Sequence, residues 1–229
     1  MHLNNVIWQA LTTRQAHFAE CWDSARRFVR EVTALCAFPE PNDDGYASLA
    51  RLAGPNGTAA IFLDEPYAPR NGWDYVAGAP LLQMICDKEN GASRTAHLDD
   101  EDMTELGDKD SPEMLELTAL TKPGPFGPRT HELGYYVGIR KQGKLIAMAG
   151  ERLKVPGYTE VSAVCTHPDH LGKGYAAALM SEVMRGIRER GETPFLHVRA
   201  DNTRAIAIYE RLGFRTAWRG HFAVLRRIT

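Results

Sequence analysis

The residues between Val164 and Leu179 are the best suited in this sequence to do chemistry. Their order, VCTHPDHLGKGYAAAL, indicates a strand that ends at Pro168, a tight turn through Gly172 and Gly174, and a helix that begins inside the turn. A helix start presents unpaired backbone N–H groups and a partial positive charge. Because the two glycines have no side chains, an anion can approach these N–H groups closely. The segment therefore predicts a binding site for a phosphate group.

Three reactive side chains lie beside this turn, namely Cys165, His167 and His170. Strand alternation places Cys165 and His167 on one face, which allows a covalent mechanism with the thiol as nucleophile and a histidine as its base. A cysteine within a strand is more often a packed side chain, and the two histidines are more typical of a loop than of metal ligands. The chain's four cysteines show neither metal-ligand spacing nor a disulfide framework. We therefore expect no catalytic triad and no metal site.

The composition excludes several classes of protein. The chain has 229 residues, of which 44% are hydrophobic, and this is enough to bury a core in one large domain or two small ones. The formal net charge of −2 argues against a nucleic-acid-binding protein. The first residues lack the basic and apolar regions of a signal peptide, and no apolar run is long enough to span a bilayer. Together with the cysteine pattern, these features predict a cytoplasmic protein with no membrane partner.

The first 93 residues carry weaker patterns than the rest. Their predicted elements are a helix with breaks, a short helix and two buried strands, at 8–35, 46–52, 59–63 and 81–85. The polar, turn-like residues 87–93 indicate a boundary. We therefore divide the chain into an N-terminal accessory α/β region, 1–93, and a second domain, 94–229.

The second domain predicts an ordered alternation of strands and helices. The expected strands are 95–98, 135–139, 145–155, 159–166, 195–198, 215–219 and 222–226, and the expected helices are 111–120, 175–190 and 202–212. Ser111 is placed to cap the first of these helices, and the strands between 135 and 166 form an antiparallel meander. The order predicts an α/β (α+β) fold in which helices flank a mixed, mostly antiparallel sheet.

The glycine turn also allows a nucleotide-binding oxidoreductase. Gly172-x-Gly174-x-x-Ala177 partly matches the dinucleotide fingerprint G-x-G-x-x-G/A, and Asp201 is placed to contact a ribose. However, an antiparallel meander precedes the turn where a parallel unit is required, and the tail that follows is too short for a second nucleotide-binding half. An ordinary glycine turn without a ligand is a further alternative.

Two separated motifs give the wider context. Residues 159–168 with Leu171-Gly172-Lys173-Gly174-Tyr175-Ala176, and then Asn202 to Phe214, resemble the acetyl-coenzyme A signature of the GNAT N-acetyltransferase superfamily. The resemblance extends from about Thr95 to the end and implies a GNAT acyltransferase fold for 94–229. The chain departs from the family at His170 and Leu171, where the family usually has Arg or Gln. Residues 1–93 carry no such signature, which leaves open a degenerate GNAT-like half.

The resemblance implies direct transfer of an acetyl group from acetyl-coenzyme A to a primary amine. The pyrophosphate would lie on the N–H groups that follow the turn, and the pantetheine arm would pair with the open edge of the preceding strand. A backbone N–H there would polarise the thioester carbonyl. The expected coenzyme-binding residues are Val164, Cys165, Thr166, Leu171, Gly172, Lys173, Gly174, Tyr175, Ala176 and Asn202. Asn202 could alternatively be only a helix N-cap.

Glu160 and Tyr209 are the catalytic residues that the resemblance implies. Glu160 stands where some GNAT enzymes carry a glutamate base, and it would take the amine proton through water. The alternative is an exposed strand glutamate without a role. Tyr209 matches the family tyrosine that gives a proton to the leaving thiolate, and the alternative is a packed tyrosine on an amphipathic helix.

Of the parts of the proposed reaction, the acceptor amine is the one that the sequence determines least. The loop 121–133 would border its pocket, with Phe126, Arg129, Thr130 and His131 as wall residues, and the acidic stretch before it could attract a cationic amine. A small-molecule or peptide amine fits equally, and a homodimer is left open. A catalytically inactive GNAT fold that binds acyl-coenzyme A as a sensor or scaffold carries the same motifs, so it remains an alternative function.

Overall fold

The computed structural model describes residues 3–87 and 103–228, which form five α-helices and two β-sheets. The helices are α1 (Val6–Thr12), α2 (Asp43–Ala53), α3 (Ser111–Thr121), α4 (Tyr175–Glu189) and α5 (Thr203–Arg211). The strands are β1 (Ala19–Trp22), β2 (Ala25–Phe28), β3 (Cys36–Ala37), β4 (Thr58–Leu63), β5 (Trp73–Ile85), β6 (Met103–Glu105), β7 (Tyr136–Lys141), β8 (Lys144–Val155), β9 (Tyr158–Thr166), β10 (Thr193–Arg199) and β11 (Arg215–Arg227). No helix in the described parts is both long and apolar enough to cross a bilayer.

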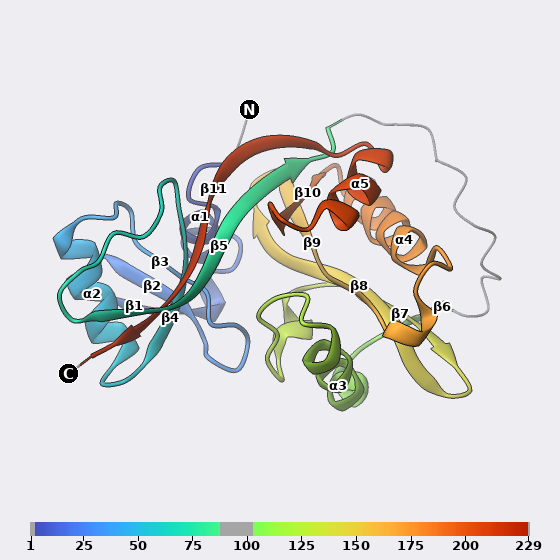
Figure 1. Ribbon diagram of the computed structural model, residues 1–229, viewed down its shortest axis with the longest axis horizontal. Helices are drawn as coiled ribbons and strands as arrows, with labels where there is room; N and C mark the ends of the chain where they lie inside the picture. Colours follow the sequence, from blue (N-terminus) through green and yellow to red (C-terminus); the bar gives the residue numbers. More distant parts are fainter. Residues whose placement is uncertain (1–2, 88–102, 229) are drawn as a thin grey trace.

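The main sheet contains eight strands in the order β4-β11-β5-β10-β9-β8-β7-β6, and β1, β2 and β3 form a small second sheet (Figure 1). Every neighbouring pair in the main sheet is antiparallel except β9 and β10, which run parallel. The predicted mixed, mostly antiparallel sheet is therefore confirmed. The meander of β7, β8 and β9 is also confirmed, with register shifts in the β8–β9 pair.

Helices cover both faces of the main sheet. On one face, α4 buries Leu179, Val183 and Ile187 in a core that α5 also joins. On the other face, Ile7 of α1 and Met114 of α3 are buried in separate cores. Each side chain of this size contributes about 1.5–3 kcal/mol when it leaves water. The apolar stripe of α4, predicted from its spacing, therefore fixes that helix against the sheet next to the glycine turn.

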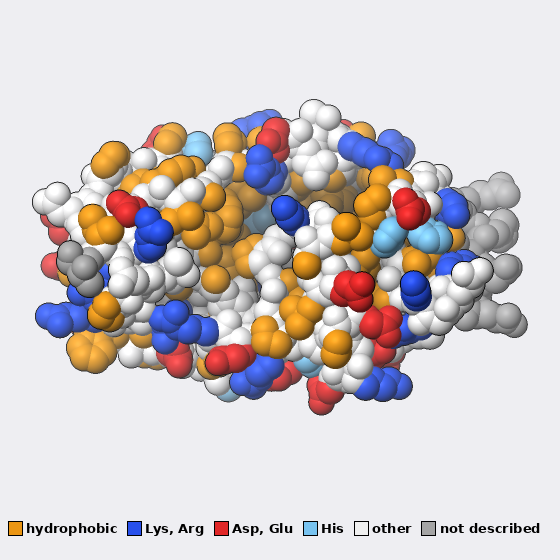
Figure 2. Space-filling model, turned by 60° about the horizontal axis from the view of Figure 1, so that its bottom comes forward, with side chains coloured by type: hydrophobic (Ala, Val, Ile, Leu, Met, Phe, Trp, Pro, Cys, Tyr) orange, Lys and Arg blue, Asp and Glu red, His pale blue; other side chains and the backbone are white. Residues whose placement is uncertain are grey.

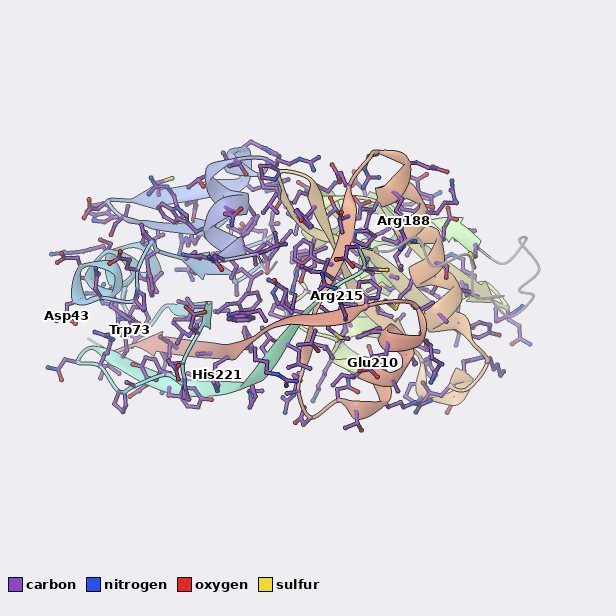
Figure 3. All side chains as sticks on the ribbon, turned by 90° about the horizontal axis from the view of Figure 1, so that it is seen from above. Asp43, Trp73, Arg188, Glu210, Arg215 and His221 are labelled. Carbon is purple, nitrogen blue, oxygen red and sulfur yellow. The ribbon has the colours of Figure 1, made fainter. Side chains whose placement is uncertain are left out.

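The main sheet draws strands from both predicted parts of the chain. β5, from the first part, pairs with β10 on one side and with β11 on the other. Seen from above, β5 and β11 extend side by side, in opposite directions, between the end that carries Asp43 and Trp73 and the end that carries Arg188 and Glu210 (Figure 3). The predicted boundary at 93 and the strand expected at 95–98 lie outside the described residues.

Three local predictions are wrong. The helix-like spacing after residue 12 gives strands, because Ala25 and Phe28 are buried in a hairpin whose turn holds Asp23 in the left-handed region at φ 46°. The two strands expected at 215–219 and 222–226 are one strand, β11. Ser111 is not the cap of α3 but its first residue, and its hydroxyl donates to the Pro128 carbonyl at 2.7 Å.

Candidate active site

The glycine turn lies between the end of β9 and the start of α4, as its sequence indicates. Gly172 and Gly174 adopt φ values of 80° and 82°, which glycine reaches without steric cost. A Cβ added to Gly172 would meet no atom within 4 Å, and residues 171–174 are exposed. Within the described residues, α4 has no side-chain cap and no acidic residue in its first turn. The first N–H groups of α4 therefore face open space, with the positive end of the helix dipole behind them.

β9 and β10 separate just before this turn. Their parallel pairing covers three residue pairs and ends at Glu160 opposite Phe195, and no further β9–β10 pair occurs in the part of the chain that the structure describes. Ala163 at φ 53° lies at a bulge in β9, where the register with β8 shifts. Bulges of this kind are frequent next to active sites because they redirect a strand. Between Glu160 and Thr166, one edge of β9 is therefore left for another extended chain.

The predicted coenzyme-binding side chains near this edge have different environments. Val164 packs toward the α4 core, whereas Cys165 is buried on the α3 side. Burial raises the pKa of the Cys165 thiol to about 11, so the thiol stays protonated at neutral pH and suits packing better than nucleophilic attack. Tyr175 is buried and Ala176 half-buried at the start of α4.

Asn202 precedes α5 as its N-cap and Tyr209 lies within α5, which is on the same face of the sheet as α4. The Asn202 side chain caps α5 by accepting the Ala205 N–H at 3.2 Å. Tyr209 is half-buried, with its ring centroid 6.2 Å from that of Phe214. Burial raises the pKa of Tyr209 to about 12, so its hydroxyl holds a proton throughout the neutral range. The roles assigned to Asn202 and Tyr209 in catalysis and coenzyme binding stay predictions.

Polar side chains form a line across the opposite face of the main sheet, and we call it the polar row. Register places Trp218 opposite Gln83, and Gln83 opposite His197. The row continues through Glu160 to Arg152 at one end and from Trp218 to Asp64 at the other. Its members are Asp64, Trp218, Gln83, His197, Glu160 and Arg152, from or next to β4, β11, β5, β10, β9 and β8. Five neighbouring strands thus contribute one side chain each, and Asp64 directly follows a sixth strand, β4.

Glu160 is the most enclosed member of the polar row, with none of its side chain exposed. Its two carboxylate oxygens each accept a hydrogen bond from Arg152 at 2.8 Å, and one lies 2.7 Å from Nδ1 of His197. A bulge in β8 also turns the Leu153 N–H toward this carboxylate, at 3.2 Å. Burial alone would raise the pKa of Glu160, but the charges and hydrogen bonds of Arg152 and His197 outweigh burial and lower the pKa to about 2.

This environment answers one question that the sequence left open. The alternative of an exposed strand glutamate is wrong, because Arg152 and His197 enclose the side chain. A carboxylate with a pKa of about 2 stays ionised but has little affinity for a proton. That Glu160 takes the amine proton stays a prediction. The imidazole of His197 lies beside this carboxylate and is a second group that can take a proton.

The hydrogen bonds around His197 determine which of its ring nitrogens carries the proton. The Leu3 N–H donates to Oε1 of Gln83 at 2.9 Å, which fixes the amide so that its Nε2 is the donor. That Nε2 lies 3.2 Å from Nε2 of His197, which must then accept. The proton of the neutral imidazole is therefore on Nδ1, where it is donated to Glu160. Nε2 is left with the lone pair that a base requires.

Sequence reasoning missed His197, Gln83 and Arg152. The sequence carries a signal for two of these residues. His197 is the single polar residue in the apolar stretch 194–198, and Gln83 is the single polar residue in the apolar stretch 81–85. A polar residue in a buried strand needs a partner, so such interruptions point to a buried network.

A cavity of about 410 Å³ lies at His197 and Gln83. The described residues from the first part of the chain supply most of its lining, with Leu3 to Ile7, Cys36 to Phe38, and Ile61 to Asp64 among them. Figure 2 shows a molecular face that is hollowed near its middle, with hydrophobic side chains along the walls. The cavity has the size and the mixed apolar and polar lining of a small-molecule site.

The wall residues predicted in the loop 121–133 do not line this cavity. Phe126 packs edge-on against the Tyr136 ring, with centroids 5.9 Å apart. Thr130 bonds the Val32 carbonyl, and Arg129 pairs with Glu132. The loop therefore fastens the first part of the chain to the second, and part of the acidic stretch before it, Asp99 to Asp102, lies outside the described residues.

Comparison with known proteins adds an independent set of findings. Residues 136–223 match the FR47-like protein family. The crystal structure of an acetyltransferase of the GNAT family from Novosphingobium aromaticivorans DSM 12444 is 36% identical, covers 100% of both chains and superposes with a TM-score of 0.89. The N-alpha-acetyltransferase RimI of Mycobacterium tuberculosis is 36% identical over 83 residues, which are 35% of this chain and 51% of that protein.

A third relative, the [ribosomal protein bS18]-alanine N-acetyltransferase of Escherichia coli strain K12, is 34% identical over 80 residues. These are 34% of this chain and 53% of the relative. The chain therefore spans about half the length of these two curated relatives, whereas its likeness to the Novosphingobium structure includes the first part of the chain as well.

Proposed function

The chain belongs to the GNAT family of acetyltransferases, and from that premise we propose that it transfers an acetyl group from acetyl-coenzyme A directly to a primary amine. Acetyl-coenzyme A supplies the thioester that the amine attacks. One observation carries the proposal: an uncapped helix start behind a glycine turn lies next to a strand edge that is left unpaired toward β10. That edge ends at a buried carboxylate, Glu160.

The coenzyme side of the site works through backbone groups. The N–H groups of Gly172 to Ala176 would bind the diphosphate, stabilised by the dipole of α4. Leu171 and Lys173 contribute backbone in the same turn, so the absence of the family's usual Arg or Gln matters little there. The backbone of Val164 to Thr166 would pair with the amide groups of the pantetheine arm. A backbone N–H in this stretch would stabilise the charge that develops on the thioester oxygen.

Two side chains would assist the proton transfers of the reaction. Tyr209 would donate to the thiolate that leaves, and its raised pKa keeps it protonated until then. Glu160 would act on the amine side, where a carboxylate assists loss of a proton from the attacking nitrogen. A lysine-type amine has a pKa of about 10.4 and an α-amine about 8, so the first needs this assistance more.

The proposal is tested first by ligand binding and turnover. Acetyl-coenzyme A should raise the melting temperature and a nicotinamide dinucleotide should not, whereas the opposite result would favour an oxidoreductase. A panel of amines is then followed by release of free coenzyme thiol. If acetyl-coenzyme A binds tightly and no amine is acetylated, the protein is a sensor or scaffold and the proposed reaction is wrong.

Tyr209→Phe separates chemistry from binding. We expect a fall in kcat of tenfold or more with nearly unchanged affinity for the coenzyme, because the change removes only the proton donor. Tyr75→Phe is the matched control, since Tyr75 is an exposed tyrosine of β5. An equal effect of the two changes would exclude the proposed role of Tyr209.

A further inference from the structure

The cavity beside His197 has the features of a site for a positively charged amine. Its rim holds the Asp64 carboxylate, whose Oδ1 accepts the Trp218 Nε1–H at 2.8 Å. This bond fixes an exposed negative charge next to an indole ring. Phe62 also lines the cavity, and its ring centroid is 4.6 Å from that of His197. Aromatic faces and a carboxylate together attract an ammonium group.

The cavity also leads to the imidazole of the polar row, whose Nε2 holds a lone pair in the neutral tautomer. His197 lines the cavity, and its side chain is 2% exposed. Its Nε2 accepts only a long contact of 3.2 Å from the Gln83 amide, which a better donor can replace. Its Nδ1–H is held by Glu160 at 2.7 Å.

Arg152 explains why Glu160 orients this imidazole and does not itself compete for the proton. The guanidinium bonds both carboxylate oxygens at 2.8 Å, so Glu160 remains ionised. An ionised partner on Nδ1 stabilises the positive charge that forms when Nε2 takes a proton. A carboxylate that orients a histidine base through Nδ1–H is also found in Ser-His-Asp catalytic triads.

We propose that this cavity binds the acceptor as a small primary ammonium on an apolar body, and that Nε2 of His197 takes its proton while Glu160 positions the imidazole. The inference rests on the proposed acetyl transfer and adds the acceptor class and the base. The lining favours a small molecule over the end of a folded protein, because separate segments at residues 3–7, 36–41 and 61–64 surround a volume of about 410 Å³.

The step balances as follows. The acceptor R–NH3+ gives one proton to Nε2 of His197, which passes it to solvent, and the free nitrogen pair forms the C–N bond to the thioester carbon. The C–S bond breaks, and sulfur keeps the bonding pair and takes the proton of Tyr209. The second proton lost by nitrogen returns to Tyr209 through water. One proton is released for each amide and free thiol formed.

The first variant is His197→Gln, assayed in the full chain with 2-phenylethylamine, tryptamine and 1,5-diaminopentane as acceptors. We expect kcat/KM to fall a hundredfold or more, the usual contribution of a general base, with unchanged affinity for acetyl-coenzyme A. The pH profile of kcat/KM should differ between the wild type and the variant, because the substitution removes the side chain proposed to take the proton. The charged groups around the ring are Glu160, Arg152 behind it, and Asp64 beyond Trp218.

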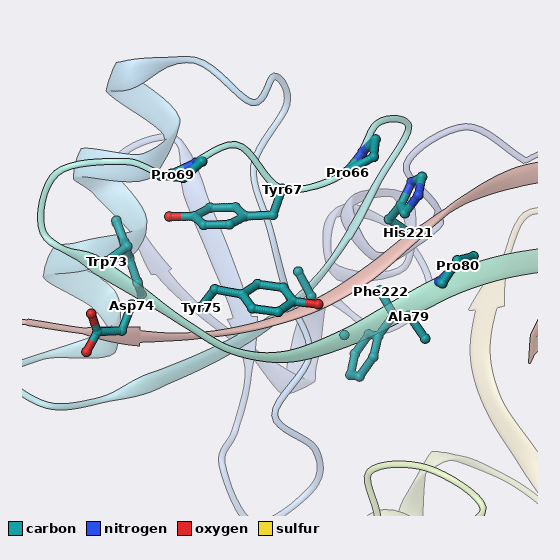
Figure 4. Close-up of a pocket in the computed structure, with 12 residues that line it drawn as sticks. Pro66, Tyr67, Pro69, Trp73, Asp74, Tyr75, Ala79, Pro80, His221 and Phe222 are labelled. Carbon is teal, nitrogen blue, oxygen red and sulfur yellow. The ribbon is translucent and has the colours of Figure 1, made fainter.

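The matched control is His221→Gln. His221 belongs to a second cavity of about 550 Å³, which lies between the paired strands β5 and β11 and the loop with Pro66 to Pro69, where Tyr67 and Tyr75 stack (Figure 4). That cavity shares no lining residue with the one beside His197. We expect His221→Gln to leave the rate and its pH profile unchanged. If both histidine variants lose activity equally, His197 is not the base.

Asp64→Asn tests amine recognition with a residue that keeps its bond to Trp218. The KM for the charged amines should rise about tenfold, with little change in kcat. A peptide with a free N-terminal alanine is run beside the amines. Efficient acetylation of the peptide alone, or indifference to Asp64→Asn and His197→Gln, would overturn the acceptor site while leaving acetyl transfer intact. Failure to acetylate any acceptor would instead contradict the proposed function itself.

Discussion

The glycine turn and the polar row differ in how the chain builds them. The turn is one contiguous segment, 171–176, and it presents backbone N–H groups to open space. The polar row takes one side chain from or next to each of six strands, and Gln83, Glu160 and Arg152 among them are buried. A site made of backbone tolerates changes of side chain, provided the turn keeps its shape. A site made of buried side chains depends on every partner.

The two regions should therefore respond differently to substitution. Changes in the turn should affect ligand binding and leave the fold nearly unaltered, because residues 171–174 are exposed and a Cβ at Gly172 would meet no atom of the described residues within 4 Å. Changes in the row should affect folding as well, because a buried charge without its partner is costly. Three experiments, from the largest expected effect to the smallest, test this distinction.

Arg152→Met should give the largest loss of stability. It leaves the Glu160 carboxylate buried without its bidentate partner, which typically costs about 3–5 kcal/mol in unfolding free energy. The control is Arg185→Met, because Arg185 also forms ion pairs with carboxylates, here those of Glu182 and Glu189, but is exposed on α4. Exposed pairs contribute less than about 1 kcal/mol, so denaturant unfolding should separate the two variants clearly. Equal losses of unfolding free energy would show that breaking the buried ion pair of the polar row is no more destabilising than breaking an exposed one.

The pH dependence of that difference has a defined sign. The pKa of Glu160 is about 2 in the folded protein, and an unfolded glutamate has about 4.3. The ion pair therefore contributes stability above about pH 5 and loses it as the pH falls toward 2. The gap in unfolding free energy between the wild type and Arg152→Met should narrow from pH 7 to pH 3. A gap that stays constant would mean that Glu160 does not cause it.

Gly172→Asn should weaken acetyl-coenzyme A binding about tenfold or more. Asparagine tolerates the left-handed backbone at φ 80°, and its side chain would occupy the open space in front of the helix start. Gly191→Asn is matched to it, since Gly191 has φ 73° and equally open surroundings after α4. Both variants should lose a similar, small amount of stability, and only Gly172→Asn should lose affinity. Equal affinities, measured by calorimetry, would place the phosphate elsewhere.

The difference between the contiguous glycine turn and the polar row also explains which features can be predicted from the sequence. The turn, α4 and the cap at Asn202 follow from local patterns, so they were found from neighbouring residues. The row required knowledge of strand order and register, since Gln83 and His197 are 114 positions apart in the chain and 3.2 Å apart in the fold. No local pattern contains that pairing. Glu160 was selected from its motif, but its ion pair with Arg152 depends on a bulge in β8 that the sequence does not reveal.

Asn202→Ala concerns a residue that caps a helix and is also predicted to bind the coenzyme, and its expected effect is the smallest. The Asn202 side chain caps α5 through the Ala205 N–H, and loss of such a cap costs about 1 kcal/mol. Asn202→Ser restores the cap but not the amide, so it should recover the unfolding free energy. If Asn202 also contacts the coenzyme, Asn202→Ser should still bind acetyl-coenzyme A a few-fold more weakly than the wild type. Full recovery of both properties in Asn202→Ser would make Asn202 a helix cap alone, and would confine coenzyme recognition to backbone groups.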